Sequence, residues 1–483
     1  MSRGAAARGR WCGHAAAGGH ARERSWTTCA GLRPGDAGGD ARVTRIAGWA
    51  LVAVAARLAM SWASAESGVF ADMAQYHERA VHLATTGTLF PDALRGPGYP
   101  ALLALVYRLG GVSFWGARVA NAFVGGALAG VTGLLARRAG AGERAWIASA
   151  VVALYPGLVL SSVYLMPEGL YTLLATLALL VVRHRSVPLA AAAGVVTGIA
   201  ILTRSVGVAL LVVCVAVSAW MWLTDVATAK RALARVAVFT GTCLLVLAPW
   251  LAFTTRVAGG PLLDATSGMN VLLGNHDTAT GRLNMADDAP LRQQHVVGAT
   301  SEADANARAL SAGVAWAVAH PGAWLRLAGA KVSWLLGLEG REHAWGYSVG
   351  YFGPRGPLTV TLWGVLLMAA FPLLVGAAAL GLARARGRLE AVHIALGTFV
   401  VATIALHVAS FGESRFHLPL LPVFAVAAAL GATPLATASR LRLVAAGAVL
   451  TVLVVVWAGQ APELVEALSA LRAPNGASTP RPY

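Results

Sequence analysis

Charge is scarce in this sequence. Only 12% of the 483 residues are Asp, Glu, Lys or Arg, whereas 57% are hydrophobic, and the mean hydropathy is +0.64. Globular domains carry about 25% charged and about 45–50% apolar residues, so the composition excludes an ordinary soluble domain. It predicts an integral membrane protein.

Acidic residues and cysteines are scarcer still. The chain has 22 Asp and Glu against 38 Lys and Arg, which gives a net charge of +16. Basic residues accumulate in the cytoplasmic loops of membrane proteins, and the alternating aromatic and basic residues of single-strand binders are lacking, so we expect no nucleic-acid partner. The four cysteines, Cys12, Cys29, Cys214 and Cys243, include no CxxC pair and predict no disulfide framework.

Long apolar runs make up most of the chain, and a membrane span needs about 20 mostly apolar residues. We predict an all-α integral membrane protein with eleven transmembrane helices, at 46–65, 116–136, 145–163, 168–183, 187–203, 204–223, 236–253, 358–383, 391–409, 416–437 and 441–459. The first span has no small-residue cleavage site and is expected to stay as a signal-anchor. Residues 45–460 form the membrane domain. Disordered tails are expected at 1–44, where a start codon placed too early is the simplest explanation, and at 461–483.

Basic residues fix the expected orientation. The run 99–110 is too short to span and carries Arg108, so we expect a helix lying on the membrane surface. The cytoplasmic loops then hold thirteen basic residues, namely Arg137, Arg138, Arg144, Arg183, Arg185, Lys230, Arg231, Arg235, Arg384, Arg386, Arg388, Arg440 and Arg442. This predicts a cytoplasmic N-terminus and two large non-cytoplasmic segments, 66–115 and 254–357. The second contains an amphipathic, Trp-marked piece at 323–337.

The stretch 69–83, "VFADMAQYHERAVHL", places unusual polarity beside the first span. Apolar residues recur at helical spacing at Val69, Met73, Tyr76, Ala80 and Leu83, and the opposite face presents Asp72, Gln75, Arg79 and His82. We predict a helix whose apolar face lies on the bilayer and whose Asp72 faces inward. The alternative is a solvated surface helix without a functional role, and for His77, Glu78 and His82 we expect no more than that.

Three further charges stand at the predicted outer ends of spans. A carboxylate such as Glu168 in "YLMPEGLYTLL" is energetically unfavourable at the membrane unless it has a functional role. The alternative is an acid at a helix N-terminus after Pro167, where the helix dipole favours negative charge. Arg204 in "ILTRSVG" and Arg415 in "SFGESRFHLPLLP" are isolated arginines on a face otherwise depleted of them. They either reach the membrane interface as ordinary surface charges or bind an anion, since arginine binds phosphate bidentately.

These pieces in this order resemble a known superfamily. Asp72 with Tyr76, then "GPGYPALLAL", "PEGLYTLL", "LTRSVG", "APW", "GNHDTATG" and "RFHLPLLP" are similar to the GT-C membrane glycosyltransferases. Within them the resemblance is to the polyprenyl-phosphate-mannose protein mannosyltransferases and the lipid A aminoarabinose transferases. It extends over roughly residues 46–437.

The resemblance implies transfer of a sugar from a polyprenyl-monophosphate carrier to a hydroxyl of a protein, lipid or glycan, on the non-cytoplasmic face and with inversion. Asp72 takes the place of the proposed catalytic base, and Glu168 that of an acid which positions acceptor or donor. Arg204, Arg415 and Arg95 are implied as ligands of the donor phosphate. The motif residues Tyr76, Tyr99 and Asn275 are implied to contact substrate.

The sequence departs from its relatives at two positions. Met73 stands where many relatives carry a second acid, and Gly96 stands where some carry Lys or Arg, with Arg95 one residue earlier. Neither an HxxxH motif nor clustered carboxylates mark a metal site, and His276 beside Asp277 is a weak signal, so we expect no metal or other cofactor. The Ala-, Gly- and Arg-rich composition indicates a bacterial plasma membrane.

Two other functions are compatible with the sequence. A multispan transporter or flippase of envelope lipids or glycans is the main alternative, but internal repeats and broken helices at mid-membrane, which are typical of transporters, are not apparent. A non-catalytic subunit of an envelope-assembly system is the other. The identity of the sugar and of the acceptor is not encoded in any motif.

Overall fold

A computed structural model describes residues 37–64, 72–182, 186–224, 226–348, 351–352, 356–385, 389–431 and 439–470. The chain divides into two units, 1–41 and 42–483, and the apolar helices from residue 42 onward belong to the second. Most of the predicted N-terminal tail, the end of the predicted C-terminal tail, and Arg183, Arg185, Arg386 and Arg388 lie outside the described residues.

The described residues contain helices and no strand, which confirms the predicted all-α class. The long apolar elements are α1 (Ala37–Ala63), α4 (Phe114–Ala136), α5 (Ala145–Leu154), α6 (Pro156–Ser161), α7 (Glu168–Val182), α8 (Val187–Thr203), α9 (Ala209–Leu223), α10 (Ala229–Val257), α16 (Pro357–Arg384), α17 (Ala391–Ala409), α18 (Leu421–Leu430) and α19 (Arg440–Ala470). Helix α19 extends beyond residue 461, where the C-terminal tail was predicted to begin.

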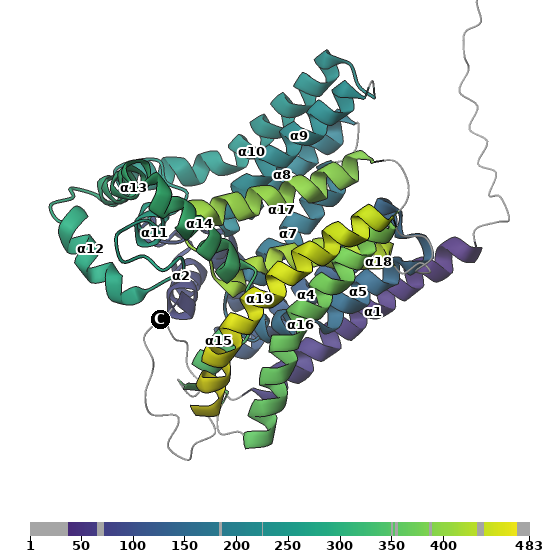
Figure 1. Cartoon of the computed structure of the whole chain (residues 1–483). Coiled ribbons are helices and arrows are strands. Elements are labelled where there is room, and N and C mark those ends of the chain that lie inside the picture. Colours follow the sequence, from purple (N-terminus) through teal and green to yellow (C-terminus); the bar gives the residue numbers. More distant parts are fainter. Residues whose placement is uncertain are drawn as a thin grey trace, which may run out of the picture. The chain divides into compact units, whose positions relative to one another are not determined.

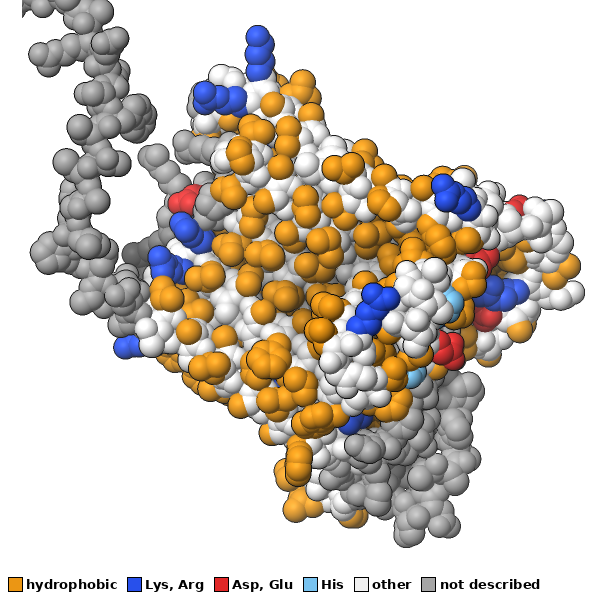
Figure 2. All heavy atoms as spheres, turned by 180° about the vertical axis from the view of Figure 1, so that it is seen from behind, with side chains coloured by type: hydrophobic (Ala, Val, Ile, Leu, Met, Phe, Trp, Pro, Cys, Tyr) orange, Lys and Arg blue, Asp and Glu red, His pale blue; other side chains and the backbone are white. Residues whose placement is uncertain are grey.

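Seven helical stretches in the described residues are long and apolar enough to cross a membrane, and three shorter apolar helices accompany them. One of the seven, Phe114–Leu154, contains the predicted span 116–136 and the first half of the predicted span 145–163, and it bends at Gly140, where φ is +100°. Each of the eleven predicted spans overlaps a helix among the described residues, and the chain is a multi-pass membrane protein. Figure 2 shows hydrophobic side chains over most of one face of this unit, with Lys and Arg mainly toward its ends.

The long helices pack in two neighbouring groups (Figure 1). Helices α7, α8, α9, α10 and α17 lie against one another, as do α4, α5, α16, α18 and α19, and α4 contacts α7. The remaining elements come from the two long loop segments. They are α2 (Asp72–Thr86), α3 (Gly98–Gly110), α11 (Ser267–Gly274), α12 (Asp288–His295), α13 (Glu302–Ala319), α14 (Pro321–Leu335) and α15 (Arg341–Ser348). Of these, α3 and α14 correspond to the amphipathic pieces predicted at 99–110 and 323–337.

Helix α2 is the predicted helix of 69–83, but its apolar face does not lie on the bilayer. Met73, Tyr76 and Ala80 are buried against α3, in a cluster that includes Tyr99 and Leu103. The prediction of a lipid-facing side was wrong because α3, placed directly after the Pro97 turn, covers it. Helix α3 leaves Leu105 and Leu109 exposed.

Four arginines close the C-terminal ends of helices. Arg57, Arg235, Arg384 and Arg442 donate hydrogen bonds to carbonyl oxygens at or just beyond the ends of α5, α7, α18 and α16, at 2.7–3.2 Å. The last carbonyls of a helix lack partners within it and carry partial negative charge, so a guanidinium stabilises them. Three of these arginines belong to the set that predicted the cytoplasmic side. Arg57 is 1% exposed, and Gly125 makes room for it, because a Cβ there would lie 2.0 Å from its Nε.

Candidate active site

A cavity of about 320 Å³ lies where the two loop segments meet the ends of the long helices. Its walls come from α2, the turn at 94–96, the start of α7, the end of α8, residues 263–273 before and within α11, residues 283–292 up to and within α12, and residues 407–416 at and after the end of α17. Four carboxylates and four arginines line it, namely Asp72, Glu168, Asp264, Asp288, Arg95, Arg204, Arg292 and Arg415. Such a density of charge is exceptional in a chain this apolar.

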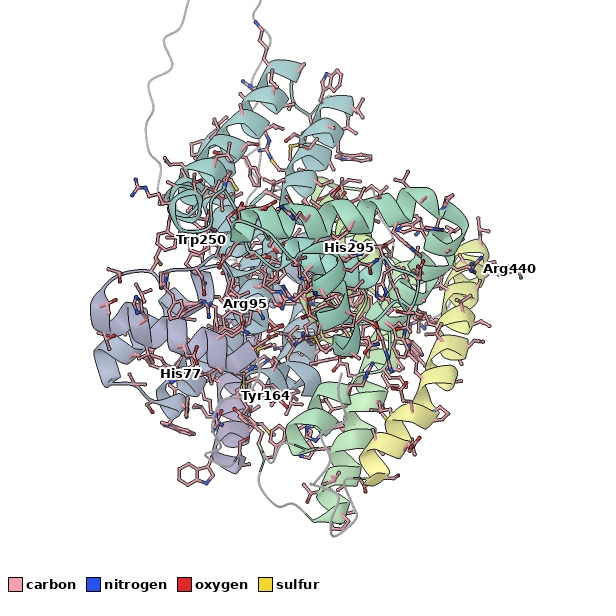
Figure 3. The ribbon with its side chains drawn as sticks, turned by 90° about the vertical axis from the view of Figure 1, so that its left-hand side faces the viewer. His77, Arg95, Tyr164, Trp250, His295 and Arg440 are labelled. Carbon is pink, nitrogen blue, oxygen red and sulfur yellow. The ribbon has the colours of Figure 1, made fainter. Side chains whose placement is uncertain are left out.

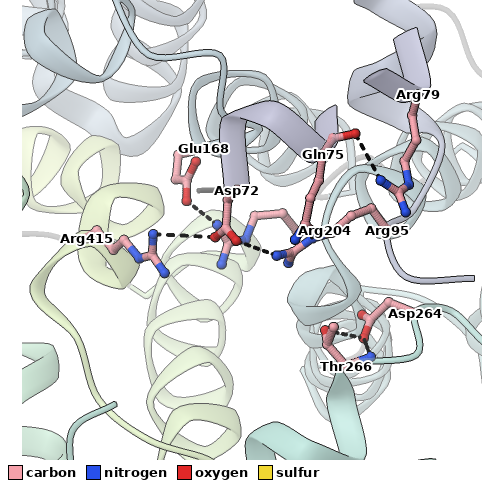
Figure 4. A network of polar contacts seen from close by, with 9 residues as sticks. All are labelled: Asp72, Gln75, Arg79, Arg95, Glu168, Arg204, Asp264, Thr266 and Arg415. Carbon is pink, nitrogen blue, oxygen red and sulfur yellow. Dashed lines mark hydrogen bonds and ion pairs between the residues drawn. The ribbon is translucent and has the colours of Figure 1, made fainter. Parts of the chain in front are cut away.

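Asp72, the first residue of α2, is held between two arginines (Figure 4). Its Oδ1 accepts a hydrogen bond from Arg95 Nη2 at 2.6 Å, and its Oδ2 lies 3.9 Å from Arg415 Nη1. Arg95 also donates through Nε to Gln75 Oε1 at 2.8 Å, so one turn of α2 fixes the guanidinium. In the view of Figure 3, Arg95 lies between the purple ribbon that carries His77 and the green ribbon of the second loop segment. The second contact of Asp72 is long, and Oδ2 is therefore the oxygen available to a ligand.

Glu168 and Arg204 form a second ion pair beside the first. Glu168 begins α7 and is 4% exposed, and its Oε1 accepts a hydrogen bond from Arg204 Nη1. No partner in the described residues reaches its other oxygen, Oε2. Glu168 thus sits at a helix N-terminus, as one explanation predicts, and is also paired inside a cavity, whereas a role in positioning acceptor or donor stays a prediction.

Phe416 brings two cationic side chains together. The guanidinium carbons of Arg204 and Arg415 lie 5.2 and 5.1 Å from the centroid of its ring. An aromatic ring attracts guanidinium groups by cation–π interaction and leaves their positive charge in place. Two arginines from distant parts of the chain therefore line one cavity, in an arrangement that can receive an anion.

The "GPG" turn explains why Gly96 replaces a basic residue. A Cβ at Gly96 would lie 2.4 Å from the carbonyl oxygen of Leu202, so the backbone of the turn packs directly on the end of α8. No side chain fits there. Arg95 supplies the positive charge from the preceding position, and the close packing brings it to the same cavity as Arg204.

Of the three residues predicted to contact substrate, one lines the cavity and two do not. Tyr76 lines the cavity, and burial raises the pKa of its phenol, which keeps it a neutral hydrogen-bond donor. Tyr99 does not line the cavity; it is fully buried and bonds to Asn121. Asn275 does not line it either, since its side chain bonds to Lys331 and to the carbonyl oxygens of Val271 and Ala409.

Lys331 is a buried cation that sequence reasoning missed. Its side chain is 0% exposed, and Nζ donates to Asn275 Oδ1 at 2.8 Å and to the carbonyl oxygen of Val408 at 2.9 Å. These bonds tie α14 to the end of α17, a few residues before Arg415. Burial lowers the pKa of Lys331 to about 8. An uncharged amine still has two hydrogens for its two acceptors.

This pKa predicts a pH dependence of stability. Between about pH 8 and 10.5 the unfolded chain holds the Lys331 proton and the folded chain does not, so folding gains free energy as pH rises. We expect the unfolding free energy of the wild type, relative to Lys331→Met, to rise by about 2 kcal/mol from pH 7 to 9.5. Unfolding in detergent at both pH values measures this difference. Parallel pH curves for the two proteins would contradict it.

The remaining polar residues of the cavity were not singled out from the sequence. Asp264, Asn270, Asp288 and Arg292 belong to the second loop segment, which has no motif that marks them. Asp288 and Arg292 pair at 2.8 Å on α12. No group of three His, Cys, Asp or Glu side chains suited to a metal occurs among the described residues, and metal independence stays a prediction.

Comparison with known proteins adds two solved structures of similar fold. No family model and no curated protein matches the chain. ArnT from Cupriavidus metallidurans, bound to undecaprenyl phosphate, is 15% identical over 88% of this chain and 69% of its own, with a TM-score of 0.47. The archaeal oligosaccharyltransferase AglB from Archaeoglobus fulgidus, in complex with an inhibitory peptide and a dolichol-phosphate, is 15% identical over 90% of this chain and 56% of its own, with a TM-score of 0.49.

The chain thus spans a little over two thirds of the first protein and little more than half of the second. At this identity the similarity concerns the fold alone, and no residue role carries over from either structure.

Proposed function

We propose that the protein is a membrane glycosyltransferase that takes a sugar from a polyprenyl-monophosphate carrier and transfers it to an acceptor hydroxyl. The observation that carries the proposal is Asp72, a carboxylate with one available oxygen, set among arginines in a cavity at the end of the apolar bundle. A base beside cations suits a reaction in which a hydroxyl loses a proton and a phosphate leaves.

In this mechanism Asp72 Oδ2 accepts the proton of the acceptor hydroxyl. The acceptor oxygen forms a bond to the anomeric carbon, and the bond between that carbon and the phosphate oxygen breaks with its electron pair going to the phosphate. Attack comes from the face opposite the phosphate, so the anomeric configuration inverts. Arg204 and Arg415 stabilise the charge that grows on the phosphate, and Glu168 holds Arg204 in place.

An open apolar groove beside the cavity suits the carrier's lipid tail. It lies between α9 and α17, has a volume of about 690 Å³, and is lined by Val208, Val212, Ile394, Val401 and Leu406, among others. Val206 and His407, each within two residues of the groove lining, line the cavity. A head group in the cavity would therefore place its tail against an apolar wall that faces lipid.

Filling this groove should weaken use of a long-chain donor. Gly397 lies in the groove with open space around it, so we expect Gly397→Trp to raise the KM for an undecaprenyl-linked donor by about tenfold, with little change for a ten-carbon analogue. Gly447→Trp, at an equally open position on α19, is the matched control. Equal effects of the two substitutions on the long-chain donor would exclude the groove as the tail site.

The function is tested with protein in lipid nanodiscs and undecaprenyl-phosphate-linked, radiolabelled mannose, glucose and 4-amino-4-deoxyarabinose. Membrane extracts supply acceptors. We expect label from one donor to pass into the acceptor fraction, and label that stays on its carrier for every donor would contradict the proposal. Movement of intact labelled carrier across a liposome membrane would favour the flippase alternative.

We also propose the bacterial plasma membrane as the location, with the N-terminus cytoplasmic and the cavity on the outer face. The basic residues Arg137, Arg138 and Arg144 support this orientation, since they lie at the end of the bundle away from the cavity. Labelling of a single introduced cysteine in the 72–110 region by a membrane-impermeant reagent in intact cells tests it. Labelling only after lysis would reverse the orientation.

A further inference from the structure

Asp264 is the carboxylate of the cavity without an ion pair among the described residues. The other three pair with arginines, Asp72 with Arg95, Glu168 with Arg204, and Asp288 with Arg292. Asp264 Oδ1 accepts hydrogen bonds from the backbone nitrogen and hydroxyl of Thr266 and from the hydroxyl of Ser267, at 2.8–3.0 Å. No hydrogen bond in the described residues reaches Oδ2.

The contacts of Oδ1 alone are those of an aspartate that holds a turn. They satisfy donors of Thr266, the N-cap residue of α11, and of Ser267, its first residue. The turn needs a single oxygen, however, and does not use the second oxygen of a carboxylate that lines the cavity. Figure 4 shows Asp264 held by Thr266, apart from the ion pairs of Asp72 and Glu168.

The backbone around Asp264 is anchored on both sides. Ala265 donates its N–H to the carbonyl oxygen of Ala93 at 2.8 Å, which ties the loop to the segment that carries Arg95. The indole of Trp250 bonds to the Leu263 carbonyl oxygen at 3.0 Å, and Thr254 bonds to Leu262. Oδ2 is therefore a fixed acceptor, and a fixed group loses little entropy when it binds a ligand.

Two amides accompany Asp264 in the same cavity. Asn270, one turn into α11, has no side-chain hydrogen bond in the described residues, and Gln75 uses its Oε1 for Arg95 while its Nε2 has none. A carboxylate accepts hydrogen bonds and an amide both donates and accepts. Because each sugar hydroxyl is at once donor and acceptor, this set matches a monosaccharide better than an apolar or purely anionic group.

We infer that Asp264 Oδ2 accepts a hydrogen bond from a hydroxyl or amino group of the transferred sugar, and that Asp264, Asn270 and Gln75 select the sugar. The inference rests on the proposed function and extends it to the side of the cavity that the second loop segment forms, where no motif marks a residue. The donor sugar is the ligand, rather than the acceptor, because the cavity volume of about 320 Å³ suits one sugar and its phosphate. The acceptor then enters at the rim, toward Asp72.

Three variants separate sugar binding from the turn before α11. Asp264→Asn keeps an oxygen for Thr266 and Ser267 but replaces the charged Oδ2, Asp264→Ala removes both oxygens, and Thr266→Val weakens the turn and keeps the carboxylate. Asp304→Asn, a half-buried acid outside the cavity that is paired with Arg308, is the control for loss of charge. The measured quantity is the affinity for the best-used donor of the sugar panel divided by the affinity for undecaprenyl phosphate.

We expect Asp264→Asn and Asp264→Ala to lower this ratio about tenfold or more, with the affinity for undecaprenyl phosphate unchanged. Thr266→Val and Asp304→Asn should leave it within about twofold. The inference is overturned if Asp264→Asn keeps the wild-type ratio, if the sugar gives the wild type no advantage over bare undecaprenyl phosphate, or if Asp264→Asn raises the KM of the acceptor alone. A wild type that neither binds undecaprenyl phosphate nor transfers sugar would instead refute the proposed function.

Discussion

Replacement of Asp72 by Asn should abolish sugar transfer and leave donor binding intact. The amide keeps the size of the side chain and can still accept the hydrogen bond from Arg95, but it cannot take the proton of the acceptor. A positioned base contributes about 10²–10⁴-fold to a rate, so we expect kcat to fall by at least about a hundredfold. Steady-state transfer in nanodiscs gives kcat, and the affinity for undecaprenyl phosphate shows whether donor binding is intact.

Glu78→Gln is the matched control for this experiment. Glu78 is an acid of the same helix that is exposed and does not line the cavity, so its loss should leave kcat unchanged. Wild-type transfer by Asp72→Asn would remove Asp72 as the base. The base would then be another carboxylate of the cavity.

The second large effect is expected at Arg204. Arg204→Met leaves the buried Glu168 carboxylate without its cation, and removal of one partner from a buried pair costs about 3–5 kcal/mol of stability. The substitution also removes a cation that faces the leaving phosphate, which lowers kcat by about 10²–10³-fold for comparable groups. Thermal unfolding in detergent and single-turnover transfer measure the two losses separately.

The double variant Arg204→Met with Glu168→Gln distinguishes these contributions. It removes the unpaired charge, so stability should return toward that of the wild type, while transfer should stay low because the phosphate still lacks Arg204. Recovery of transfer together with stability would mean that Arg204 acts only as the ion-pair partner of Glu168. The assignment of Arg204 to the phosphate would then be withdrawn.

The charges that sequence reasoning found are those at the ends of apolar runs. Asp72, Glu168, Arg204 and Arg415 stand out because each interrupts or borders a span, and the structure brings all of them to one cavity. Because the membrane restricts charged residues to the ends of the spans, their positions along the chain predict that they lie at the same end of the bundle. Arg95 was predicted for the same site, one residue before a glycine whose packing on α8 leaves no room for a side chain.

The second loop segment resisted prediction for a physical reason. Its helices α11 and α12, which contribute to the cavity, have eight residues each, so periodicity does not reveal which residues face the cavity. Asp264 reaches the wall because the residues beside it bond to Ala93, Trp250 and Thr254, and no motif predicts these contacts. Asn275 was expected to bind substrate, but Lys331, 56 residues later, occupies its side chain.

The configuration of the transferred sugar tests the central claim most directly. If Asp72 activates the acceptor opposite a phosphate held by Arg204 and Arg415, the product linkage has the anomeric configuration opposite to that of the polyprenyl-phosphate donor. Carbon–proton coupling at the anomeric centre, measured by NMR on donor and product, distinguishes the two configurations. Inversion is the expected result. Retention would require either two displacements through a sugar held covalently by the protein or attack from the face of the leaving phosphate, and would contradict the proposed mechanism.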